Sequence, residues 1–494
     1  MGLRLLGSFA ALTAALLLGA AEQGAALGRA QGAALPPYCG VRGSNVADLA
    51  APSEPGLSLV AVQVFIRHGA RTPAAPCGDV LATPGKWDCN EAFNEAPAFE
   101  EASNASRWRF RRSYRGSQNV MGGTCESGQL LDEGYQQHAE LGTQLRKAYR
   151  QNGRVASIEG PLGDSNTAES GEAEMVRGRS TDLSRTRASM ESLLQNFLGE
   201  TSGGIMTIQT LDFATDTLYP NVKACPRLAA LEKAAWADPD FIQWNSTSPE
   251  KIKLDADLAQ ALGGLRYGLE MAGGHLFDCV MSATCEGRAN ELLPRTLTAE
   301  MRDELVRQAE HREYWKLHFN DKAYAKLTAQ PLIAASMAFA KEAIESSKAA
   351  NFKVPNFKVW SAHDTSVMPL QVALGTEDGK WAPYAHAVVL EVWRRGEEAF
   401  VRLSSDGRVR VASGCASELC PYADFVAATQ WANAPRDCDA PHMPTPQVVS
   451  GASRDAFGDA FGVVSLAAVL SFGLGAAVAA YLARRKAPPS YAVL

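Results

Sequence analysis

The chain has 494 residues, 10 of them cysteine, and its 48 Lys and Arg against 54 Asp and Glu give a net charge of −6. An apolar fraction of 46% is enough for a packed core and excludes disorder along the whole chain. The acidic balance argues against a nucleic-acid partner, because such proteins neutralise phosphates with clustered Lys and Arg. The length allows about three domains, or one large domain with an insertion.

The first residues are typical of a secretory signal peptide. Arg4 is followed by an apolar run from Leu5 to Leu18 and by the small residues Gly19-Ala20-Ala21. A basic start, an apolar stretch of about 14 residues and small residues before the cut predict that residues 1–21 are removed. An uncleaved signal anchor is the alternative, although the run is short for a span of about 20 residues.

The other end predicts one transmembrane helix. Residues 460–483 carry no charge, and the basic cluster Arg484–Lys486 follows at once. Such a stretch can span a bilayer with some tilt, and the positive-inside rule places the basic cluster in the cytoplasm. We therefore expect a single-pass type I membrane protein with a stalk at 439–459 and a cytoplasmic tail at 484–494. A GPI signal is the alternative, which the eight residues beyond the basic cluster disfavour.

The cytoplasmic tail ends in a short motif. Tyr491-Ala-Val-Leu494 has the Tyr-x-x-apolar form of a sorting signal, so Tyr491 is a candidate contact for a sorting adaptor. We expect an endosomal or lysosomal membrane, or the cell surface. Ser471 and Gly475 in the predicted span would permit close helix contact, which keeps a homodimer among the alternatives.

The lumenal part between these segments is acidic and rich in cysteine. Four basic residues, Arg4 and the cluster 484–486, lie outside it, which leaves 44 against 54 and a net charge of −10. An even number of cysteines behind a signal peptide predicts disulfides. Asn104 and Asn245 begin Asn-x-Ser/Thr triplets and are candidate glycosylation sites. The cysteines are Cys39, Cys77, Cys89, Cys125, Cys225, Cys279, Cys285, Cys415, Cys420 and Cys438.

Strand and helix patterns alternate along the lumenal part. Leu57–Ile66 is a continuous apolar run, typical of a buried strand of parallel type, and Phe357–Ala362 is a second strand. Apolar residues at helical spacing mark Asp132–Arg150 and Asp182–Leu198. Several helical patterns at about 220–330, such as that of Leu297–Lys316, indicate a helical cap.

Towards the end of this part, His386–Arg395 and Phe400–Ala412 alternate as strands, with a turn at 405–407. Strands alternating with helices predict the α/β class. We expect a doubly wound, mainly parallel sheet with helices on both faces. It would lie within one domain at 57–440 that carries the cap as an insertion.

Reactive residues follow both apolar strands. Arg67, His68 and Arg71 come at the end of the first, and His363 and Asp364 follow the second. In open α/β sheets ligands collect at the carboxyl ends of strands, so these side chains should meet. Guanidinium groups match phosphate oxygens, and a neutral imidazole can attack phosphorus. A carboxyl group can protonate the leaving oxygen. The pattern predicts phosphoryl-transfer chemistry.

Three segments resemble a known family. Arg67–Pro73 (RHGARTP) resembles the RHGxRxP signature of the histidine acid phosphatases, branch 2 of the histidine phosphatase superfamily. Ser361–Thr365 (SAHDT) resembles the family's HD motif. Arg179–Thr186 resembles the middle segment that supplies a third phosphate-binding arginine, which would be Arg185. The resemblance covers about residues 57–440.

The resemblance implies a mechanism that needs no metal and no other cofactor. His68 would attack the phosphomonoester, and Asp364 would protonate the leaving alcohol, which favours acidic pH. The phosphoryl oxygens would be held by Arg67, Arg71, Arg185 and His363. The resemblance also implies the disulfides Cys415–Cys420 and Cys225–Cys438, and it leaves the other six cysteines unassigned.

The substrate stays open at this point. Position 70 is Ala, where lysosomal and prostatic phosphatases have Asp. Many phytases have Ala there, yet the acidic net charge disfavours an inositol phosphate with several phosphates. Cys125–Tyr149 and the Cys279/Cys285 region also resemble the 2-phosphoxylose phosphatase group, which acts on a phosphosugar. A non-catalytic surface glycoprotein is disfavoured because every expected site residue is present. Phosphoglycerate-mutase-like transfer is disfavoured by the signal peptide, the cysteines and the HD motif.

Overall fold

The computed structural model describes residues 35–40, 45–49, 51–74, 77, 87, 89, 125–151, 176–198, 206–263, 276–348 and 357–439. The predicted signal peptide, transmembrane helix and tail lie outside these residues, as do Asn104, Ser471, Gly475 and Tyr491. None of the helices in the described ranges has the length and hydropathy of a membrane span. The chain divides into two compact units, 1–439 and 440–494, and the first contains all the described residues.

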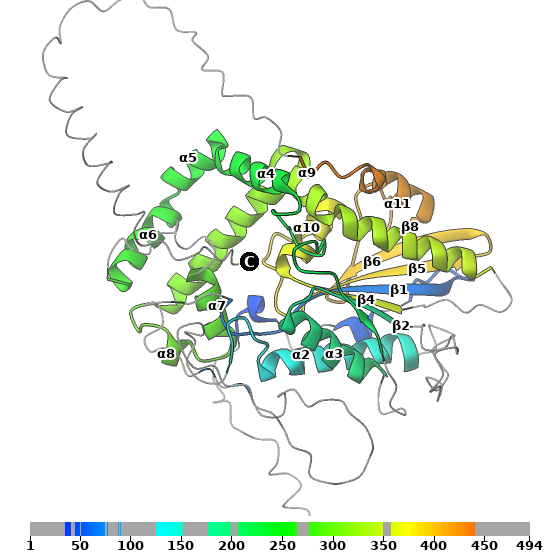
Figure 1. The fold of residues 1–494 in the computed structure, drawn as a ribbon, viewed down its shortest axis with the longest axis horizontal. Coiled ribbons are helices and arrows are strands. Elements are labelled where there is room, and N and C mark those ends of the chain that lie inside the picture. The colour runs from blue at the N-terminus through cyan, green and yellow to red at the C-terminus, as the bar shows by residue number, and fades with distance from the viewer. Residues whose placement is uncertain are drawn as a thin grey trace, which may run out of the picture. The chain divides into compact units, whose positions relative to one another are not determined.

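A mixed sheet of eight strands is the centre of the first unit (Figure 1). The strands are β1 (Ser58–Arg67), β2 (Val176–Ser180), β3 (Ile208–Gln209), β4 (Phe357–Ala362), β5 (Ala387–Arg395), β6 (Glu398–Ser405), β7 (Arg408–Arg410) and β8 (Leu419–Pro421). Their order is β3-β2-β4-β1-β5-β6-β7, and β8 pairs with β6.

The prediction of a mainly parallel sheet is wrong for one half of it. β1, β4, β2 and β3 pair in parallel, whereas β5 to β8 are joined to β1 and to one another in antiparallel fashion. The cause is the length of the connections. Only two residues, Gly396 and Glu397, join β5 to β6, and a parallel pair needs a crossover of a dozen or more. Asp406 and Gly407, both at positive φ, form the next two-residue turn.

Ten α-helices occur in the described ranges. They are α2 (Asp132–Leu145), α3 (Ser184–Leu198), α4 (Pro226–Trp236), α5 (Pro239–Thr247), α6 (Pro249–Ala261), α7 (Phe277–Cys285), α8 (Ala289–Leu292), α9 (Ala299–Ser346), α10 (Asp364–Leu374) and α11 (Tyr422–Ala428). A π-helical turn, η5 (Arg146–Gln151), continues α2, and short 3-10 turns occur at η1 (Pro37–Cys39), η2 (Asn45–Asp48) and η8 (Gln430–Asn433).

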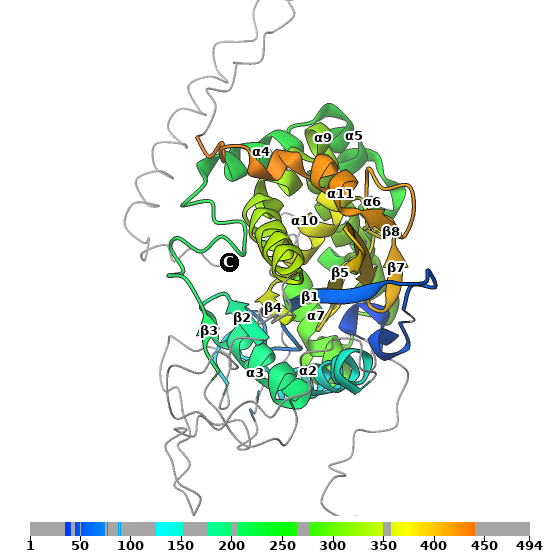
Figure 2. The same cartoon turned by 90° about the vertical axis from the view of Figure 1, so that its right-hand side faces the viewer.

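Helices cover both faces of the sheet, and β1 is apolar on both sides for this reason (Figure 2). Val62 and Val64 pack with the apolar residues of α2 and α3 on one face. Val60 and Phe65 pack with α4, α9 and α10 on the other. The expectation of an α/β fold with helices on both faces therefore holds.

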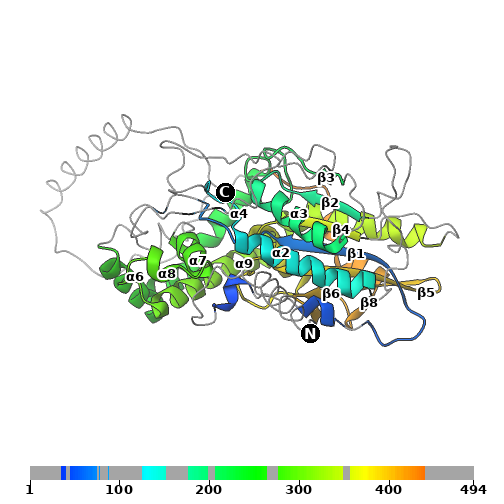
Figure 3. The same ribbon diagram turned by 90° about the horizontal axis from the view of Figure 1, so that it is seen from below.

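Between 220 and 330 most of the described residues are helical. α5, α6, α7 and α8 gather at one end of the sheet, with the first half of α9 (Figures 1 and 3). α9 is interrupted at Phe319–Lys322, where the backbone leaves helical geometry and three residues have positive φ. Its first half matches the helix expected at Leu297–Lys316, and its second half lies against the sheet. Asn245, the candidate glycosylation site, lies partly exposed in α5.

Five disulfides join all ten cysteines. They are Cys39–Cys285, Cys77–Cys279, Cys89–Cys125, Cys225–Cys438 and Cys415–Cys420. The last two are the pairings that the resemblance implies. The first two both end on α7, which ties this helix to the segments before and after β1.

Candidate active site

The register of the parallel strands brings distant motifs together. Arg67 at the end of β1 is opposite Ala362 at the end of β4, so His68 and His363 follow side by side. Their ring centroids are 5.5 Å apart in an edge-on arrangement. β2 pairs with the other side of β4, which brings the start of α3 and Arg185 to the same edge of the sheet.

His68 is buried, and one ring nitrogen is already engaged. Its Nδ1 lies 2.9 Å from the carbonyl oxygen of Gly69. A carbonyl oxygen only accepts, so Nδ1 carries the proton of the neutral ring and Nε2 carries the free electron pair. Burial, followed by the charges of Arg185 and Arg71, holds the pKa of His68 well below its ordinary 6.5. The imidazole therefore stays neutral at an acidity that protonates an ordinary histidine.

The backbone of the His68 loop is held by two helices. Gly69 N–H donates to Ser189 Oγ of α3 at 3.1 Å, and Ala70 N–H donates to Gln137 Oε1 of α2 at 2.9 Å. The approach is close because Gly69 and Gly134 face each other without side chains. A Cβ on Gly69 would lie 2.5 Å from the carbonyl oxygen of Gly134. These contacts fix the loop before any ligand arrives.

Two arginines of the loop are buried against carboxylates. Arg67 Nη2 lies 2.8 Å from Asp364 Oδ2, and Arg71 Nη2 lies 2.9 Å from Asp278 Oδ1. Arg67 Nη1 also donates to the carbonyl oxygen of Ala382 at 2.6 Å. Although burial alone would lower the pKa of Arg71, Asp278 raises it. These contacts orient both guanidinium groups.

Arg185 completes the cationic group from the first turn of α3. Its guanidinium lies against Gly128, where a Cβ would be 3.2 Å from Nη1. Burial, then the charge of Arg71, lowers the pKa of Arg185 to about 9, so it is still cationic at neutral and acidic pH. The buried Nε atoms of Arg67, Arg71 and Arg185 have no hydrogen-bond partner among the described residues. Such donors are suited to an anion.

His363 caps α10 and lies near the same arginines. Its Nε2 lies 3.0 Å from the hydroxyl oxygen of Thr181, which follows β2 directly. Burial and the nearby Arg185 keep the pKa of His363 well below 6.5, although Asp364 acts in the opposite direction. A neutral His363 can donate a hydrogen bond without adding to the repulsion among the arginines.

Asp364 is held from both carboxylate oxygens. Oδ1 accepts from Thr365 N–H at 2.8 Å, and Oδ2 accepts from the Trp381 indole N–H at 3.2 Å, on the side of Arg67. Burial alone would raise the pKa of Asp364, but Arg67 and Arg71 outweigh it and lower the value. Asp364 is therefore a carboxylate in the unliganded site.

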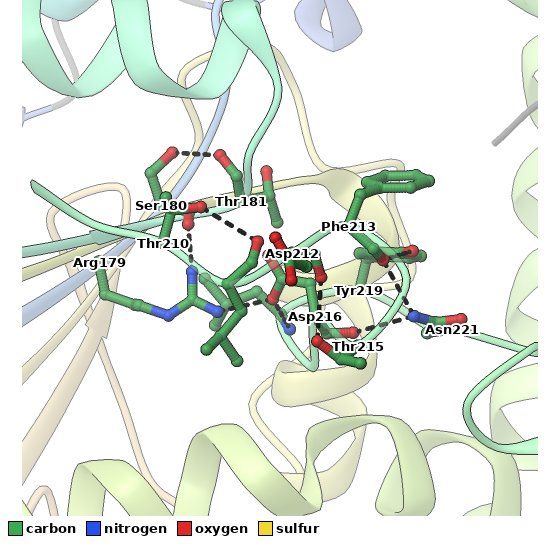
Figure 4. A network of polar contacts seen from close by, with 12 residues as sticks. Arg179, Ser180, Thr181, Thr210, Asp212, Phe213, Thr215, Asp216, Tyr219 and Asn221 are labelled. Atoms are coloured by element: carbon green, nitrogen blue, oxygen red, sulfur yellow. Dashed lines mark hydrogen bonds and ion pairs between the residues drawn. The ribbon is translucent and has the colours of Figure 1, made fainter.

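A network of polar contacts joins the segment after β3 to Arg179 and Thr181 at the end of β2 (Figure 4). Arg179 Nη2 and Asp216 Oδ1 form a buried ion pair at 2.7 Å, and Asp216 Oδ1 also accepts from Leu218 N–H at 2.9 Å. This pair ties the segment after β3 to the end of β2. It places the Tyr219 ring edge-on to His363 at 6.4 Å. Arg179, the first arginine of the middle motif, thus has a structural partner.

The structure brings all six expected site residues to one edge of the sheet, and it adds three that sequence reasoning missed. Asp278 comes from the cap, and Trp381 and Tyr384 come from the segment before β5. An isolated aspartate in a cap helix carries no sequence signal of its own. Only the position of Cys279 beside it, within a disulfide to the loop after His68, could have suggested it.

Comparison with known proteins agrees with this geometry. A family profile described as histidine phosphatase superfamily (branch 2) matches residues 58–265. Counting factor 60 of Dictyostelium discoideum is 28% identical over 387 residues, which are 75% of this chain and 85% of the relative. Lysophosphatidic acid phosphatase type 6 of Mus musculus is 25% identical over 385 residues, covering 75% and 84%. Lysosomal acid phosphatase of Homo sapiens is 26% identical over 321 residues, covering 61% and 70%.

A solved structure shares the fold. Klebsiella sp ASR1 phytase superposes with a TM-score of 0.51 at 18% identity, over 81% of this chain and 100% of the phytase. At this identity the likeness concerns the fold alone. The profile match and these relatives show that the chain is similar to branch 2 of the histidine phosphatase superfamily.

Proposed function

We propose that the protein is an acid phosphatase that hydrolyses phosphomonoesters through a phosphohistidine on His68. The observation that carries the proposal is the state of this imidazole. It is buried, its Nδ1 is bonded to a carbonyl oxygen, and its pKa is depressed by burial and three arginines. A neutral nucleophile surrounded by guanidinium groups suits attack on an anionic phosphorus centre.

The reaction has two steps. Nε2 of His68 attacks phosphorus, the bond to the ester oxygen breaks, and the leaving oxygen takes a proton from Asp364. Water then attacks the phosphohistidine, gives a proton to the Asp364 carboxylate, and the P–N electron pair returns to Nε2. Arg67, Arg71 and Arg185 offset the charge on the phosphoryl oxygens in both steps.

The proton on Asp364 arrives with the substrate. A phosphomonoester loses its second proton near pH 6, so at lower pH it binds as a monoanion. Its charge offsets Arg67 and Arg71, which are the groups that depress the pKa of Asp364. The proton can then move to the carboxylate. The acidic preference therefore comes from the substrate, while the low pKa of His68 keeps the nucleophile active.

The charge of the pocket favours a substrate with one phosphate. Three arginines face the two carboxylates of Asp278 and Asp364, which leaves one net positive charge among these five groups. A site for an inositol carrying several phosphates would need more cations. A phosphatase specific for a phosphosugar, such as 2-phosphoxylose, fits one net positive charge as well as an acid phosphatase of broad specificity does. Two of the relatives are likewise named as phosphatases, lysosomal acid phosphatase and lysophosphatidic acid phosphatase type 6.

We further propose that the active site is lumenal or extracellular, in a type I protein of an endolysosomal or surface membrane. The apolar stretch 460–483, the acceptor Asn245 on an exposed helix and five disulfides support this placement. Protease treatment of sealed microsomes tests it. Digestion of the lumenal part without opening the vesicles would contradict the orientation.

The test of activity is hydrolysis of an aryl phosphate by the purified protein between pH 4 and 8, with His68→Ala beside it. We expect a maximum near pH 5 in the wild type and a loss of at least 10³-fold in the variant, since the nucleophile is removed. Full activity of a folded His68→Ala protein would show that His68 is not the nucleophile. A folded wild type that is inactive on aryl, sugar and lipid phosphates would favour the non-catalytic glycoprotein.

A further inference from the structure

A tyrosine without an assigned role lies beside the nucleophile. The segment before β5 runs along the His68 loop, because Ala385 N–H donates to the His68 carbonyl oxygen at 3.2 Å and Arg67 N–H donates to that of His386 at 3.0 Å. Ala385 has φ 57°, in the left-handed region that few residues other than glycine adopt. Strain of this kind gathers at functional sites and here fixes where the neighbouring Tyr384 lies.

The Tyr384 ring is buried within the cationic group. The Arg67 guanidinium lies over its face at 4.2 Å from the centroid, and the His68 ring centroid is 5.9 Å away. Its phenol also interacts electrostatically with Arg71 and Arg185. Tyr384 therefore lies beside the nucleophile and Arg67 and near the other two arginines of the site, and it is 2% exposed.

The hydroxyl of Tyr384 has no hydrogen-bond partner among the described residues. Two other buried tyrosine hydroxyls are bonded: that of Tyr149 donates to Glu391 at 2.8 Å, and that of Tyr219 donates to the Phe213 carbonyl oxygen at 2.6 Å. The buried hydroxyl of Tyr38 is also without a hydrogen-bond partner among the described residues, but it faces Thr284 and not a cation of the site. A buried donor left unpaired destabilises the folded state, so its retention in a pocket of cations points to a ligand that pairs with it.

We propose that Tyr384 contacts the substrate, with its hydroxyl donating a hydrogen bond to a phosphoryl oxygen of the bound phosphomonoester. The inference rests on the proposed function and adds a neutral donor to the charged ones. The side near Arg71 and Arg185 is where the non-bridging oxygens would lie, because Asp364 must face the leaving oxygen. A donor fixed there stabilises charge in the transition state without reorganising.

The test is Tyr384→Phe, which removes the hydroxyl and keeps the ring beneath Arg67. We expect kcat/KM for an aryl phosphate to fall about 10- to 100-fold, and inhibition by vanadate to weaken by a similar factor. The unfolding midpoint should stay the same or rise, because an unpaired hydroxyl leaves the core. Tyr38→Phe is the matched control. Tyr38 belongs to the same apolar cluster as Tyr384, but its hydroxyl faces Thr284 of α7, so activity should not change.

The outcomes separate this inference from the proposed function. A Tyr384→Phe protein with kcat/KM within twofold of the wild type overturns the inference and leaves the phosphatase proposal intact. A lowered unfolding midpoint with unchanged vanadate inhibition overturns it too, since it indicates a structural role. If the wild type hydrolyses nothing, calorimetric titration with vanadate still decides. Equal affinity in Tyr384→Phe and wild type then overturns the contact.

Discussion

His138 of α2 gives the protein a specific sensitivity to acid. Its side chain is fully buried, and burial lowers its pKa from 6.5 to about 3, against an opposing contact with the Arg67 backbone. In the unfolded chain the same imidazole titrates normally. Below pH 6.5 the unfolded state therefore binds a proton at His138 that the folded state does not bind until the pH approaches 3. The folded state loses stability as pH falls from 6.5 towards 3.

The size of the effect follows from linkage. At pH 5 the solution is 1.5 units below the unfolded pKa and about two units above the folded one, so His138 lowers the free energy of unfolding by about 2 kcal/mol relative to neutral pH. His138→Leu removes the titrating group and keeps an apolar side chain of similar bulk. Denaturant unfolding of both proteins at pH 7.5 and pH 5 gives the difference of differences, which should be about 2 kcal/mol.

A control with the opposite sign is available in the same fold. His318 of α9 pairs with Glu377 at 2.8 Å, and this hydrogen bond raises its pKa. Its stabilising contribution is present below pH 6.5 and is lost as pH rises, so His318→Gln should make the protein more sensitive to acid. Identical losses of stability between pH 7.5 and pH 5 in His138→Leu and wild type would refute the reasoning.

Three further predictions concern the loop and the carboxylates of the site. Gly134→Ala places a Cβ against the Ala70 carbonyl oxygen, so it should lower both the unfolding midpoint and kcat. Gly142→Ala, whose Cβ would meet α3 away from the site, should lower only the unfolding midpoint. Calorimetry measures the midpoints, and kcat is compared per folded molecule. Asp278→Asn weakens the ion pair that orients Arg71, and we expect KM and the inhibition constant of inorganic phosphate to rise about 10-fold. Unchanged inhibition by phosphate would refute the idea that Asp278 orients Arg71 for phosphate binding. Trp381→Phe removes a donor to Asp364, so alkyl phosphates should lose more rate than aryl phosphates with better leaving groups; equal losses would count against it.

Strands β1 and β4, which precede the reactive residues, could be predicted because their sequence pattern does not depend on contacts with distant parts of the chain. β4 has the expected bounds, and β1 is displaced by one residue from Leu57–Ile66, since both are unbroken apolar runs buried on two faces. Helix α10 begins at Asp364, directly after β4, because His363 acts as its N-cap. The first residue of this helix could be predicted only if His363 were already known to lie at the end of β4 and to cap the helix.

Other features depend on distant contacts and left little trace in the sequence. β2 has the pattern Val-Arg-Gly-Arg-Ser, which is typical of a polar turn, yet it is a strand with a neighbour on both sides, β3 and β4. It is tolerated there because Asp216 neutralises Arg179 and because Gly178 makes room for Met190. The carboxylate on Arg71 comes from Asp278, about two hundred residues along the chain, through the disulfide Cys77–Cys279. Sequence periodicity does not predict ion pairs or disulfides between distant segments.

The central claim is that phosphate passes through a covalent bond to His68. Brief incubation with a labelled aryl phosphate, followed by denaturation in alkali, traps a phosphohistidine, and peptide mapping locates it. The account predicts label on His68 in the wild type, more label in Asp364→Asn with a good leaving group because the water step is slowed, and none in His68→Ala. Hydrolysis at the full rate without a labelled enzyme, or label on another residue, would contradict it.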